Sequence, residues 1–259
     1  MVDLYAGAAA CYARYRPGYP PQVLDRVRSA FGLHGIGRLL DVGCGTGQLV
    51  LALHRDVHDA LAIDISPEML AEAERARVAI GAANVQLRCL AAEEISPSLG
   101  SFRLVTFGSS LHWMHRYVVL LKSYALTEPG GGVAIVASDS IWSSEQPFAL
   151  IVRAVVQRWL GPERQTLAGA YAASSERHED VLARTPFVDI QVSATEWDRE
   201  ADADAIIGEL YSTSFANRAL FGDHAAGFEE DLRHALLALD SRGRFVVGER
   251  THCILARKR

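Results

Sequence analysis

The chain has 259 residues, of which 49% are hydrophobic and 22% charged, and its formal net charge at pH 7 is −5. This composition is typical of a folded globular protein and excludes disordered, collagen-like and coiled-coil chains. The negative charge argues against a protein that grips nucleic acid over a broad basic face, so we expect no nucleic-acid partner.

The spacing of the cysteines and the length of the apolar segments indicate the cellular compartment. Cys11, Cys44, Cys89 and Cys253 lie far apart and form no C-x-x-C pair, so neither a zinc site nor a disulfide framework is predicted. The N-terminus lacks a signal-peptide pattern, and no apolar run approaches the roughly 18 residues of a membrane span. We therefore expect a cytoplasmic protein without a membrane partner, as a monomer or homodimer.

Short β-branched apolar runs alternate with helical patterns from about residue 20 to residue 137. This alternation predicts βαβ units and a parallel sheet. The predicted strands cover residues 38–42, 60–65, 85–90, 104–107 and 133–137. A helix over 48–55 follows the first strand, and a turn at 129–132 precedes the fifth.

The helix after the second strand has the clearest boundaries. Ser66 would supply an N-cap oxygen, Pro67 takes the first helical position, and Glu68 complements the helix dipole. Gly81 would end the helix.

The rhythm changes after residue 138. An amphipathic helix from Phe148 to Trp159 precedes an expected irregular loop over 161–175. The rest of the chain predicts strands over 188–197 and 244–256 and helices near 201–213 and 225–239, which would complete the same sheet. At the other end of the chain, the aromatic segment 5–21 ends in a rigid non-helical stretch from Pro17 to Pro21.

These elements predict an α/β fold: a Rossmann-like, doubly wound, mostly parallel sheet of seven strands, with helices on both faces and an insertion after the fifth strand. We expect a single domain. Its parts would be an N-terminal lid (1–21), a cofactor-binding core (22–138), a helical insertion (139–185) and a region that completes the sheet and meets the acceptor (186–259).

A glycine-rich turn, Asp41-Val42-Gly43-Cys44-Gly45-Thr46-Gly47, joins the first strand to its helix. Glycines at this place let a ligand approach the backbone closely. The dinucleotide pattern G-x-G-x-x-G would need glycine where the chain has Gln48, and the lysine of a phosphate-binding P-loop is absent.

Asp64 ends the predicted second strand, seventeen residues after Gly47. A carboxylate at this tip can accept hydrogen bonds from both hydroxyls of a ribose. Ligands of open α/β sheets bind beyond the carboxyl ends of the strands, so the tips of the first four strands should converge on one site. The glycine turn and Asp64 together predict a nucleoside cofactor.

The segments LLDVGCGTGQL and AIDISPEML closely resemble the cofactor segments of the class I S-adenosylmethionine-dependent methyltransferases, and the resemblance covers roughly residues 12–137. It implies S-adenosylmethionine as cofactor and S-adenosylhomocysteine as product. The methionine part would face Asp41 and the turn, the ribose Asp64, and the adenine Ile65 and Met69. Many relatives have an aspartate where this chain has Ala91. Backbone groups near Ala92 and Glu93 would bind the adenine instead. The implied cofactor residues are Arg16, Asp41, Gly43, Cys44, Gly45, Gly47, Asp64, Ile65, Met69, Ala92, Glu93 and Ser109.

The segment YARYRPGYP and the pair His112-Trp113 also resemble small-molecule members of that family, including trans-aconitate-type methyltransferases. In such members the N-terminal segment folds over the cofactor, which implies a small acceptor. Arg16 would pair with a carboxylate of the cofactor or of the acceptor, or it is a surface arginine. Tyr15, Tyr19 and Trp113 would wall the acceptor site, or they are core aromatics.

Methyl transfer from a sulfonium is an in-line displacement in which positioning of the two reactants dominates. We expect the acceptor atom to be an oxygen, hydroxyl or carboxyl, of a small metabolite. His112 would face this atom as base or hydrogen-bond partner, because imidazole titrates near neutrality. The alternative is that His112 only orients Trp113.

Other patterns carry less weight. His54 and His58 lack the glutamate of H-E-x-x-H, and His112 and His115 have no acidic or cysteine partner nearby, so no metal is expected. N- or S-methylation, a nicotinamide-dependent oxidoreductase and a cofactor-binding protein without activity remain as alternatives. Gln48 disfavours the oxidoreductase.

Overall fold

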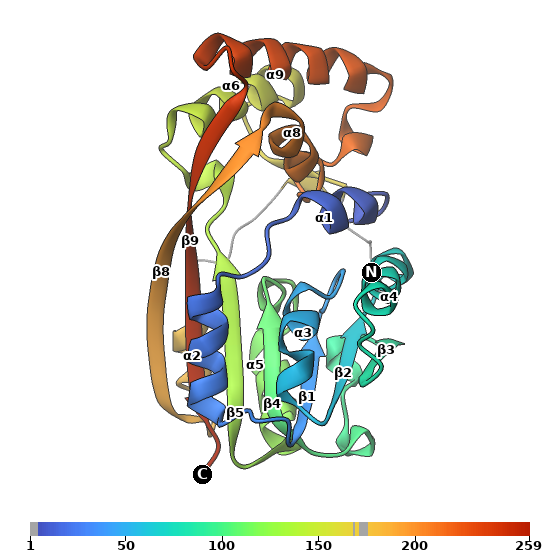
Figure 1. The fold of residues 1–259 in the computed structure, drawn as a ribbon, viewed down its shortest axis with the longest axis vertical. Coiled ribbons are helices and arrows are strands. Elements are labelled where there is room, and N and C mark those ends of the chain that lie inside the picture. The colour runs from blue at the N-terminus through green and yellow to red at the C-terminus, as the bar shows by residue number, and fades with distance from the viewer. Residues whose placement is uncertain (1–4, 168, 171–175) are drawn as a thin grey trace. The chain divides into compact units, whose positions relative to one another are not determined.

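The computed structural model describes residues 5–167, 169–170 and 176–259. The chain folds into two compact units (Figure 1). The sheet unit comprises Gly18–Ser138, Ser174–Thr195 and Arg250–Arg259. The helical unit comprises Met1–Pro17, Asp139–Ala173 and Glu196–Glu249. Each unit is described by itself.

A seven-stranded sheet with the order β3-β2-β1-β4-β5-β9-β8 forms the sheet unit, with the ends of β8 and β9 continuing into the helical unit. The strands are β1 (Arg38–Val42), β2 (Asp59–Asp64), β3 (Val85–Cys89), β4 (Phe102–Gly108), β5 (Thr127–Ser138), β8 (Val188–Asp202) and β9 (Arg244–Arg257). Strands β1 to β5 pair in parallel, and β9 runs antiparallel to β5. The predicted mostly parallel, seven-stranded Rossmann-like sheet is confirmed.

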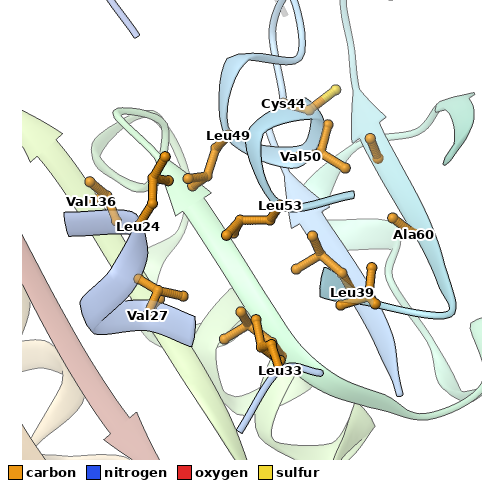
Figure 2. Close-up of a cluster of buried hydrophobic side chains, with 14 of the residues drawn as sticks. Leu24, Val27, Leu33, Leu39, Cys44, Leu49, Val50, Leu53, Ala60 and Val136 are labelled. Carbon is orange, nitrogen blue, oxygen red and sulfur yellow. The ribbon is translucent and has the colours of Figure 1, made fainter. Parts of the chain in front are cut away.

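Helices cover both faces of the sheet, as Figure 1 shows for α2 and α3 in front and α5 behind. The helices of this unit are α2 (Pro21–Phe31), α3 (Gln48–Leu53), α4 (Pro67–Ala79), α5 (Arg116–Leu126) and α7 (His178–Leu182). Successive side chains of a strand point to opposite faces. Accordingly Leu39 packs with Val27 and Leu53 in the cluster of Figure 2, whereas Leu40 packs with residues of α5 and α7 on the other face.

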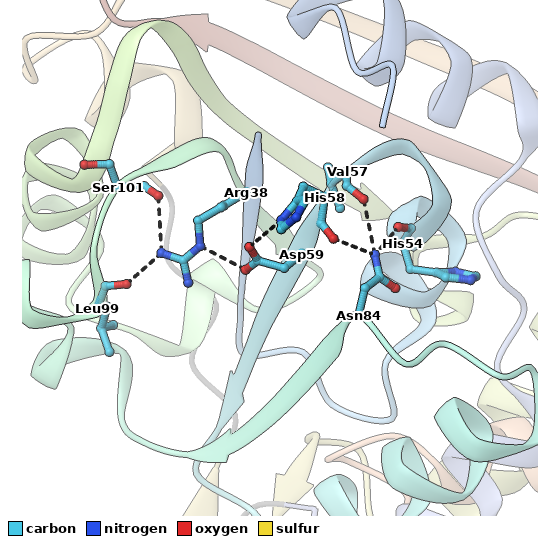
Figure 3. A network of polar contacts seen from close by, with 8 residues as sticks. All are labelled: Arg38, His54, Val57, His58, Asp59, Asn84, Leu99 and Ser101. Carbon is cyan, nitrogen blue, oxygen red and sulfur yellow. Dashed lines mark hydrogen bonds and ion pairs between the residues drawn. The ribbon is translucent and has the colours of Figure 1, made fainter. Parts of the chain in front are cut away.

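The amino ends of the strands are tied together by polar contacts (Figure 3). The guanidinium of Arg38 donates to the Asp59 carboxylate at 2.9 Å and to the Leu99 carbonyl at 3.0 Å. Asn84 donates to the carbonyls of His54 (2.7 Å) and Val57 (3.2 Å). These contacts fix the loops at the end of the sheet opposite to the glycine turn.

Most predicted boundaries lie within two residues of the structure, and β1 has the predicted bounds. Ser66 is the N-cap residue of α4, as predicted. The predicted capping hydrogen bond from its side-chain oxygen is wrong, because the Ser66 side chain makes no capping hydrogen bond. Its backbone amide donates to Asp64 Oδ1 at 2.9 Å instead. The residue before the helix therefore serves to orient the carboxylate of Asp64.

The predicted turn at 129–132 is also wrong, because β5 runs through it. The pairing with β4 shifts from Phe102↔Thr127 to Leu104↔Gly132, so the intervening residues form a bulge. A Cβ on Gly132 would lie 2.1 Å from the Ala256 carbonyl oxygen. Here glycine permits close approach of the next strand.

The predicted irregular loop over 161–175 contains a small hairpin, because β6 (Gln165–Thr166) pairs antiparallel with β7 (Gly169–Ala170). Residues 168 and 171–175 of that predicted loop lie outside the described residues.

The helical unit is built from α1 (Ala9–Tyr15), α6 (Pro147–Leu160), α8 (Ala203–Tyr211) and α9 (Ala225–Leu239). Its apolar cluster includes Phe221 and Phe228, whose rings stack at 4.0 Å. The Tyr15 ring lies against Gly208, where a Cβ would be 2.2 Å from Tyr15 Cδ2. The predicted helices near 148–159, 201–213 and 225–239 are confirmed, whereas α1 was not anticipated.

Candidate functional site

The glycine turn is shaped by positive φ angles, +68° at Gly43, +54° at Gly45 and +88° at Gly47. The amides of Gly43 and Cys44 both donate to the Ile63 carbonyl, at 2.8 and 2.9 Å, and so hold the turn against β2. A Cβ on Gly43 would lie 2.7 Å from the Cβ of Ser110, whereas a Cβ on Gly45 would meet nothing within 4 Å. Packing therefore requires glycine at 43, and the chain leaves the face of Gly45 open to a ligand.

Asp64 lies beside this turn at the tip of β2. Its Oδ2 accepts a hydrogen bond from the Gly45 amide at 2.8 Å, and its Oδ1 accepts one from the Ser66 amide at 2.9 Å. Two backbone donors thus fix the carboxylate in place. A carboxylate is an acceptor-only group with two oxygens, which is the chemistry that two vicinal hydroxyls of a ribose require.

Asp41, at the penultimate position of β1, is buried. Its Oδ1 accepts a hydrogen bond from the Thr106 hydroxyl at 2.7 Å, whereas its Oδ2 has no hydrogen-bond partner among the described residues. Burial, reinforced by the charge of Asp64, raises the pKa of Asp41 to about 7. The hydroxyl of Thr46 is likewise buried without a partner in the described chain.

A buried polar atom without a partner costs about 1–3 kcal/mol. The ammonium of an amino-acid group would satisfy Asp41 Oδ2, so the residues present fit the methionine end of the cofactor. Ile65, the predicted adenine contact, is an aliphatic side chain that remains 44% exposed directly after β2. Exposure of an aliphatic side chain at a strand tip is what stacking on an adenine ring would use.

The other two predicted adenine contacts, Met69 and Ala92, are buried in the packing of the sheet unit. The Glu93 carboxylate accepts a hydrogen bond from the His115 amide at 3.0 Å, and its carbonyl accepts one from Lys122 Nζ. The predicted contacts of Met69, Ala92 and Glu93 with the cofactor stay predictions.

The loop after β4 is bound to its neighbours on both sides. Ser109, at φ +52°, donates its amide to the Val136 carbonyl at 2.8 Å. The Ser110 hydroxyl donates to the Val42 carbonyl at 2.7 Å. The tip of β4 is therefore held to β5 and β1, and the short helix Leu111–Trp113 begins from a fixed point.

His112 lies in this short helix, exposed, with its ring centroid 4.7 Å from that of Trp113. Desolvation of the part of the imidazole that the chain covers, followed by the nearby His178 and Arg116, lowers the pKa of His112 below its usual value. Its imidazole is therefore neutral at pH 7. A neutral imidazole has one nitrogen that donates and one that accepts a hydrogen bond.

Tyr19 is brought to the same strand tip: a Cβ on Gly108 would lie 2.8 Å from the Tyr19 hydroxyl. Tyr15 and Arg16 belong to the helical unit. There Arg16 Nε donates to the Ser212 hydroxyl at 2.7 Å, and its guanidinium lies 5.2 Å from the centre of the Tyr12 ring. The roles predicted for Tyr15 and Arg16 stay predictions.

The sequence analysis missed Arg116 and His178, whose charges contribute to the lowered pKa of His112. No local pattern marks them, because the bond that brings them together joins residues 60 positions apart, from Arg116 to Glu176. Among the described residues, no group of three or more His, Cys, Asp or Glu side chains has an arrangement that would hold a metal ion. No described helix is long and apolar enough to cross a membrane.

Comparison with known proteins places this geometry in a family. Residues 39–131 match the family described as a methyltransferase domain. An uncharacterized methyltransferase of Mycobacterium tuberculosis is 27% identical over 214 residues, covering 82% of this chain and 76% of the relative. The tRNA 5-carboxymethoxyuridine methyltransferase of Escherichia coli is 30% identical over 117 residues, 44% of each chain.

Among solved structures, phosphoethanolamine N-methyltransferase 2 of Haemonchus contortus has a TM-score of 0.58 at 18% identity. The match covers 100% of this chain and 60% of that one, which was crystallised with phosphomonomethylethanolamine and S-adenosylhomocysteine. This likeness shows the shared fold.

The predicted resemblance to the class I S-adenosylmethionine-dependent methyltransferases is confirmed, and the methyltransferase-domain match covers residues 39–131 of this chain. The predicted enzyme class and its cofactor are confirmed. The glycine turn and Asp64 lie at the tips of β1 and β2, and the cofactor contacts that the resemblance implied for them stay predictions. A nicotinamide-dependent oxidoreductase is set aside.

Proposed function

We propose that this methyltransferase transfers the methyl group to an oxygen, hydroxyl or carboxyl, of a small metabolite, and that His112 contacts the acceptor. The observation that carries the proposal is the exposed, neutral His112 ring fixed beside Trp113 at the tip of β4. In the parallel sheet this tip adjoins that of β1, which carries the glycine turn.

Bound S-adenosylmethionine supplies an electrophilic methyl group on a sulfonium. The chain's part is to orient the two reactants, which in well-aligned cases contributes roughly 7–11 kcal/mol. Asp41, the glycine turn and Asp64 would hold the cofactor at one edge of the site. Tyr19 and Trp113 present a hydroxyl and an indole near the tip of β4, on the acceptor's side.

The lowered pKa of His112 makes it a weak base at pH 7, so it suits an acceptor oxygen that needs little deprotonation. A carboxylate needs none, and the imidazole N–H would then donate to its non-reacting oxygen. An acidic hydroxyl comes next, with the imidazole accepting its proton. Both acceptors carry the methyl group on oxygen.

A small acceptor is supported by the net charge of −5, since binding to phosphate backbones draws on a basic surface. The Escherichia coli relative acts on tRNA according to its name, but its match spans 44% of this chain. The helical unit lies outside residues 39–131, which match the methyltransferase-domain family, and we place selection of the acceptor there.

The test uses purified protein with methyl-labelled S-adenosylmethionine and separate pools of small acids, alcohols, amines, thiols and tRNA. We expect label in the acid or the alcohol pool. Mild alkali releases methanol from a methyl ester and leaves methyl ethers and N-methyl groups intact, so it recognises a methylated carboxylate, and mass spectrometry of the labelled product identifies the acceptor atom in the other pools. Label only in amines, thiols or RNA would contradict the proposal.

The role of His112 is tested by His112→Ala, which should lower turnover by at least about tenfold. Affinity for S-adenosylhomocysteine should be retained, because the cofactor is bound by β1 and β2. His115→Ala, an exposed histidine three positions on, is the matched control and should retain turnover. Unchanged turnover in His112→Ala removes His112 from the mechanism.

A further inference from the structure

Two hydrogen bonds hold the segment that carries His112, one at each end. At the start of the segment, the Ser110 hydroxyl donates to the Val42 carbonyl of β1 at 2.7 Å. At its end, the amide of His115, the N-cap residue of α5, donates to Glu93 Oε1 at 3.0 Å. The first bond attaches the segment to the sheet. The second bond comes from the loop after β3, and the function proposed above assigns no role to it.

Glu93 lies in the short helix Ala92–Glu94 and is bound to α5 at two places. Its carboxylate accepts the amide at the start of α5, and its backbone carbonyl accepts a hydrogen bond from Lys122 Nζ within α5. The adjacent Ala92 is buried with Leu111 in the apolar cluster that also contains residues of α5. Packing and Lys122 therefore fix the backbone of Glu93, so its carboxylate can fix something else.

The charge of Glu93 suits its place. The amino end of a helix carries a partial positive charge that a carboxylate stabilises. The first turn of α5 has no acidic residue of its own. Glu93 supplies the negative charge from a segment more than twenty residues earlier in the chain.

The topology explains why such a contact matters. In the sheet order, β2 and β1 lie between β3 and β4, so strand pairing does not connect the loop after β3 with the loop after β4. The bond from His115 to Glu93 joins these two loops directly, on the face of the sheet that α5 covers.

Between the two end contacts lies a single short turn. The Trp113 amide donates to the Ser110 carbonyl at 3.0 Å, and the Met114 amide to the Leu111 carbonyl at 3.2 Å. Isolated turns of this kind are weak, because few bonds offset the ordering of the backbone. The orientation of His112 therefore depends on both ends of the segment being held.

We propose that Glu93 is a positioning residue: its carboxylate holds the His115 amide and so sets where His112 meets the methyl acceptor. The inference rests on the proposed function, in which His112 contacts the acceptor. The adenine contact implied for Glu93 uses its backbone, so the side chain and the backbone have separate roles.

Two variants remove this hydrogen bond from its two sides. Glu93→Ala removes the acceptor. His115→Pro removes the donor, and proline fits because His115 has φ −69° and the preceding Met114 is extended. The controls are Glu93→Gln, which keeps an oxygen acceptor, and His115→Ala, which keeps the amide.

Turnover of the full chain is measured with methyl-labelled S-adenosylmethionine and the acceptor pool that wild type methylates. We expect kcat to fall about tenfold in Glu93→Ala and in His115→Pro, and to stay within about threefold of wild type in both controls. KM for S-adenosylmethionine and calorimetric affinity for S-adenosylhomocysteine should change by less than about twofold. The double variant should lose no more than either single variant, because both remove one bond.

A His112→Ala background shows whether Glu93 acts through His112. There Glu93→Ala should lower kcat no further. Hydrogen exchange with S-adenosylhomocysteine bound needs no acceptor. Amides 111–114 should exchange about tenfold faster in Glu93→Ala than in wild type, whereas those of the α5 interior should not change.

Unchanged kcat in Glu93→Ala, or the same loss in the His112→Ala background as in wild type, overturns the proposal. Weaker binding of S-adenosylhomocysteine with unchanged exchange of 111–114 also overturns it, because the side chain would then act on the cofactor. Should His115→Pro not fold, Glu93→Ala and Glu93→Gln still decide.

The two proposals fail separately. Methyl transfer to oxygen with full turnover in Glu93→Ala removes this inference and leaves the proposed acceptor standing. Methyl transfer only to nitrogen or sulfur, with the expected losses in Glu93→Ala and His115→Pro, contradicts the proposed acceptor and supports the positioning role.

Discussion

The two units of the molecule hold their charged side chains in different ways. In the sheet unit the carboxylate of Asp64 is fixed by two backbone amides within the same strand tips. In the helical unit Arg199 of β8 lies between Glu209 of α8 and Glu249 of β9, with all three side chains between 10 and 17% exposed. The position of the Asp64 carboxylate therefore depends on the local path of the backbone, whereas the stability of the helical unit depends on side chains that meet only after folding.

The largest expected effect is in the helical unit. Arg199→Met should destabilise the fold by about 3–5 kcal/mol, because it removes the cation that pairs with both Glu209 and Glu249 and leaves these two carboxylates with Arg16 as a neighbouring positive charge. Urea unfolding measures the loss. Adding Glu249→Gln to this variant should recover part of it. If Arg199→Met alone were as stable as wild type, the helical unit would be stabilised by its backbone and not by this ion-pair network.

Gly43→Ala tests the backbone rule in the sheet unit. The added Cβ meets Ser110 at 2.7 Å and Met114 Cε at 2.8 Å, at a φ of +68°. Overpacking and the left-handed conformation together should cost about 2–4 kcal/mol of stability. Gly45→Ala, which meets no neighbour within 4 Å, should cost only about 1–2 kcal/mol. Thermal unfolding of both variants gives the comparison, and equal losses would contradict the packing argument.

Asp64→Asn should weaken binding of S-adenosylhomocysteine by about 10- to 150-fold, since hydrogen bonds to a charged group contribute roughly 1.5–3 kcal/mol. Asp59→Asn, at the other end of the same strand, is the matched control and should bind as wild type. Calorimetric titration of the two proteins decides. Similar affinities of Asp64→Asn and Asp59→Asn for S-adenosylhomocysteine would show that Asp64 does not bind the ribose.

The smallest expected effect is a pH dependence, in which stability and affinity for S-adenosylhomocysteine change in opposite directions. Asp41 has its pKa raised to about 7 in the folded protein from 3.8, so the folded state binds the proton more tightly between these values. Without ligand, stability should therefore fall as pH rises from 5.5 to 7.5. A ligand ammonium favours the ionised carboxylate, so affinity for S-adenosylhomocysteine should rise about tenfold over the same range.

Urea unfolding and calorimetry at three pH values measure both trends. Asp41→Asn cannot titrate at this position and should flatten the two curves. Trends of the same sign, or trends that persist in the variant, would remove Asp41 from the cofactor site.

The sequence predicted the sheet unit well where signals are local. A buried strand followed by glycines gives β1 and its turn, and a proline at the first helical position gives the start of α4. The bulge in β5 was missed because glycines before a strand normally indicate a turn, and only the approach of β9 reveals their other use.

The residues of the candidate site also fall into two groups, those that local sequence motifs predict and those that only tertiary packing brings together. The motif residues Asp41, Gly45 and Asp64 were found because strand tips follow from the order of elements along the chain. Arg116 and His178 were not found, because their meeting depends on α7 packing against α5. Ion pairs such as Arg199 with Glu249 cannot be predicted from the sequence either, since arginines and glutamates are common on any protein surface.

The place of β9 has a consequence for synthesis on the ribosome. This strand follows every other strand of the sheet in chain order, yet it lies between β5 and β8. Until it emerges, the backbone groups of β5 and β8 that face it have no strand to pair with, and exposed strand edges promote aggregation. Nascent chains stalled before residue 244 should therefore bind chaperones far longer than chains stalled after a linker that lets β9 insert.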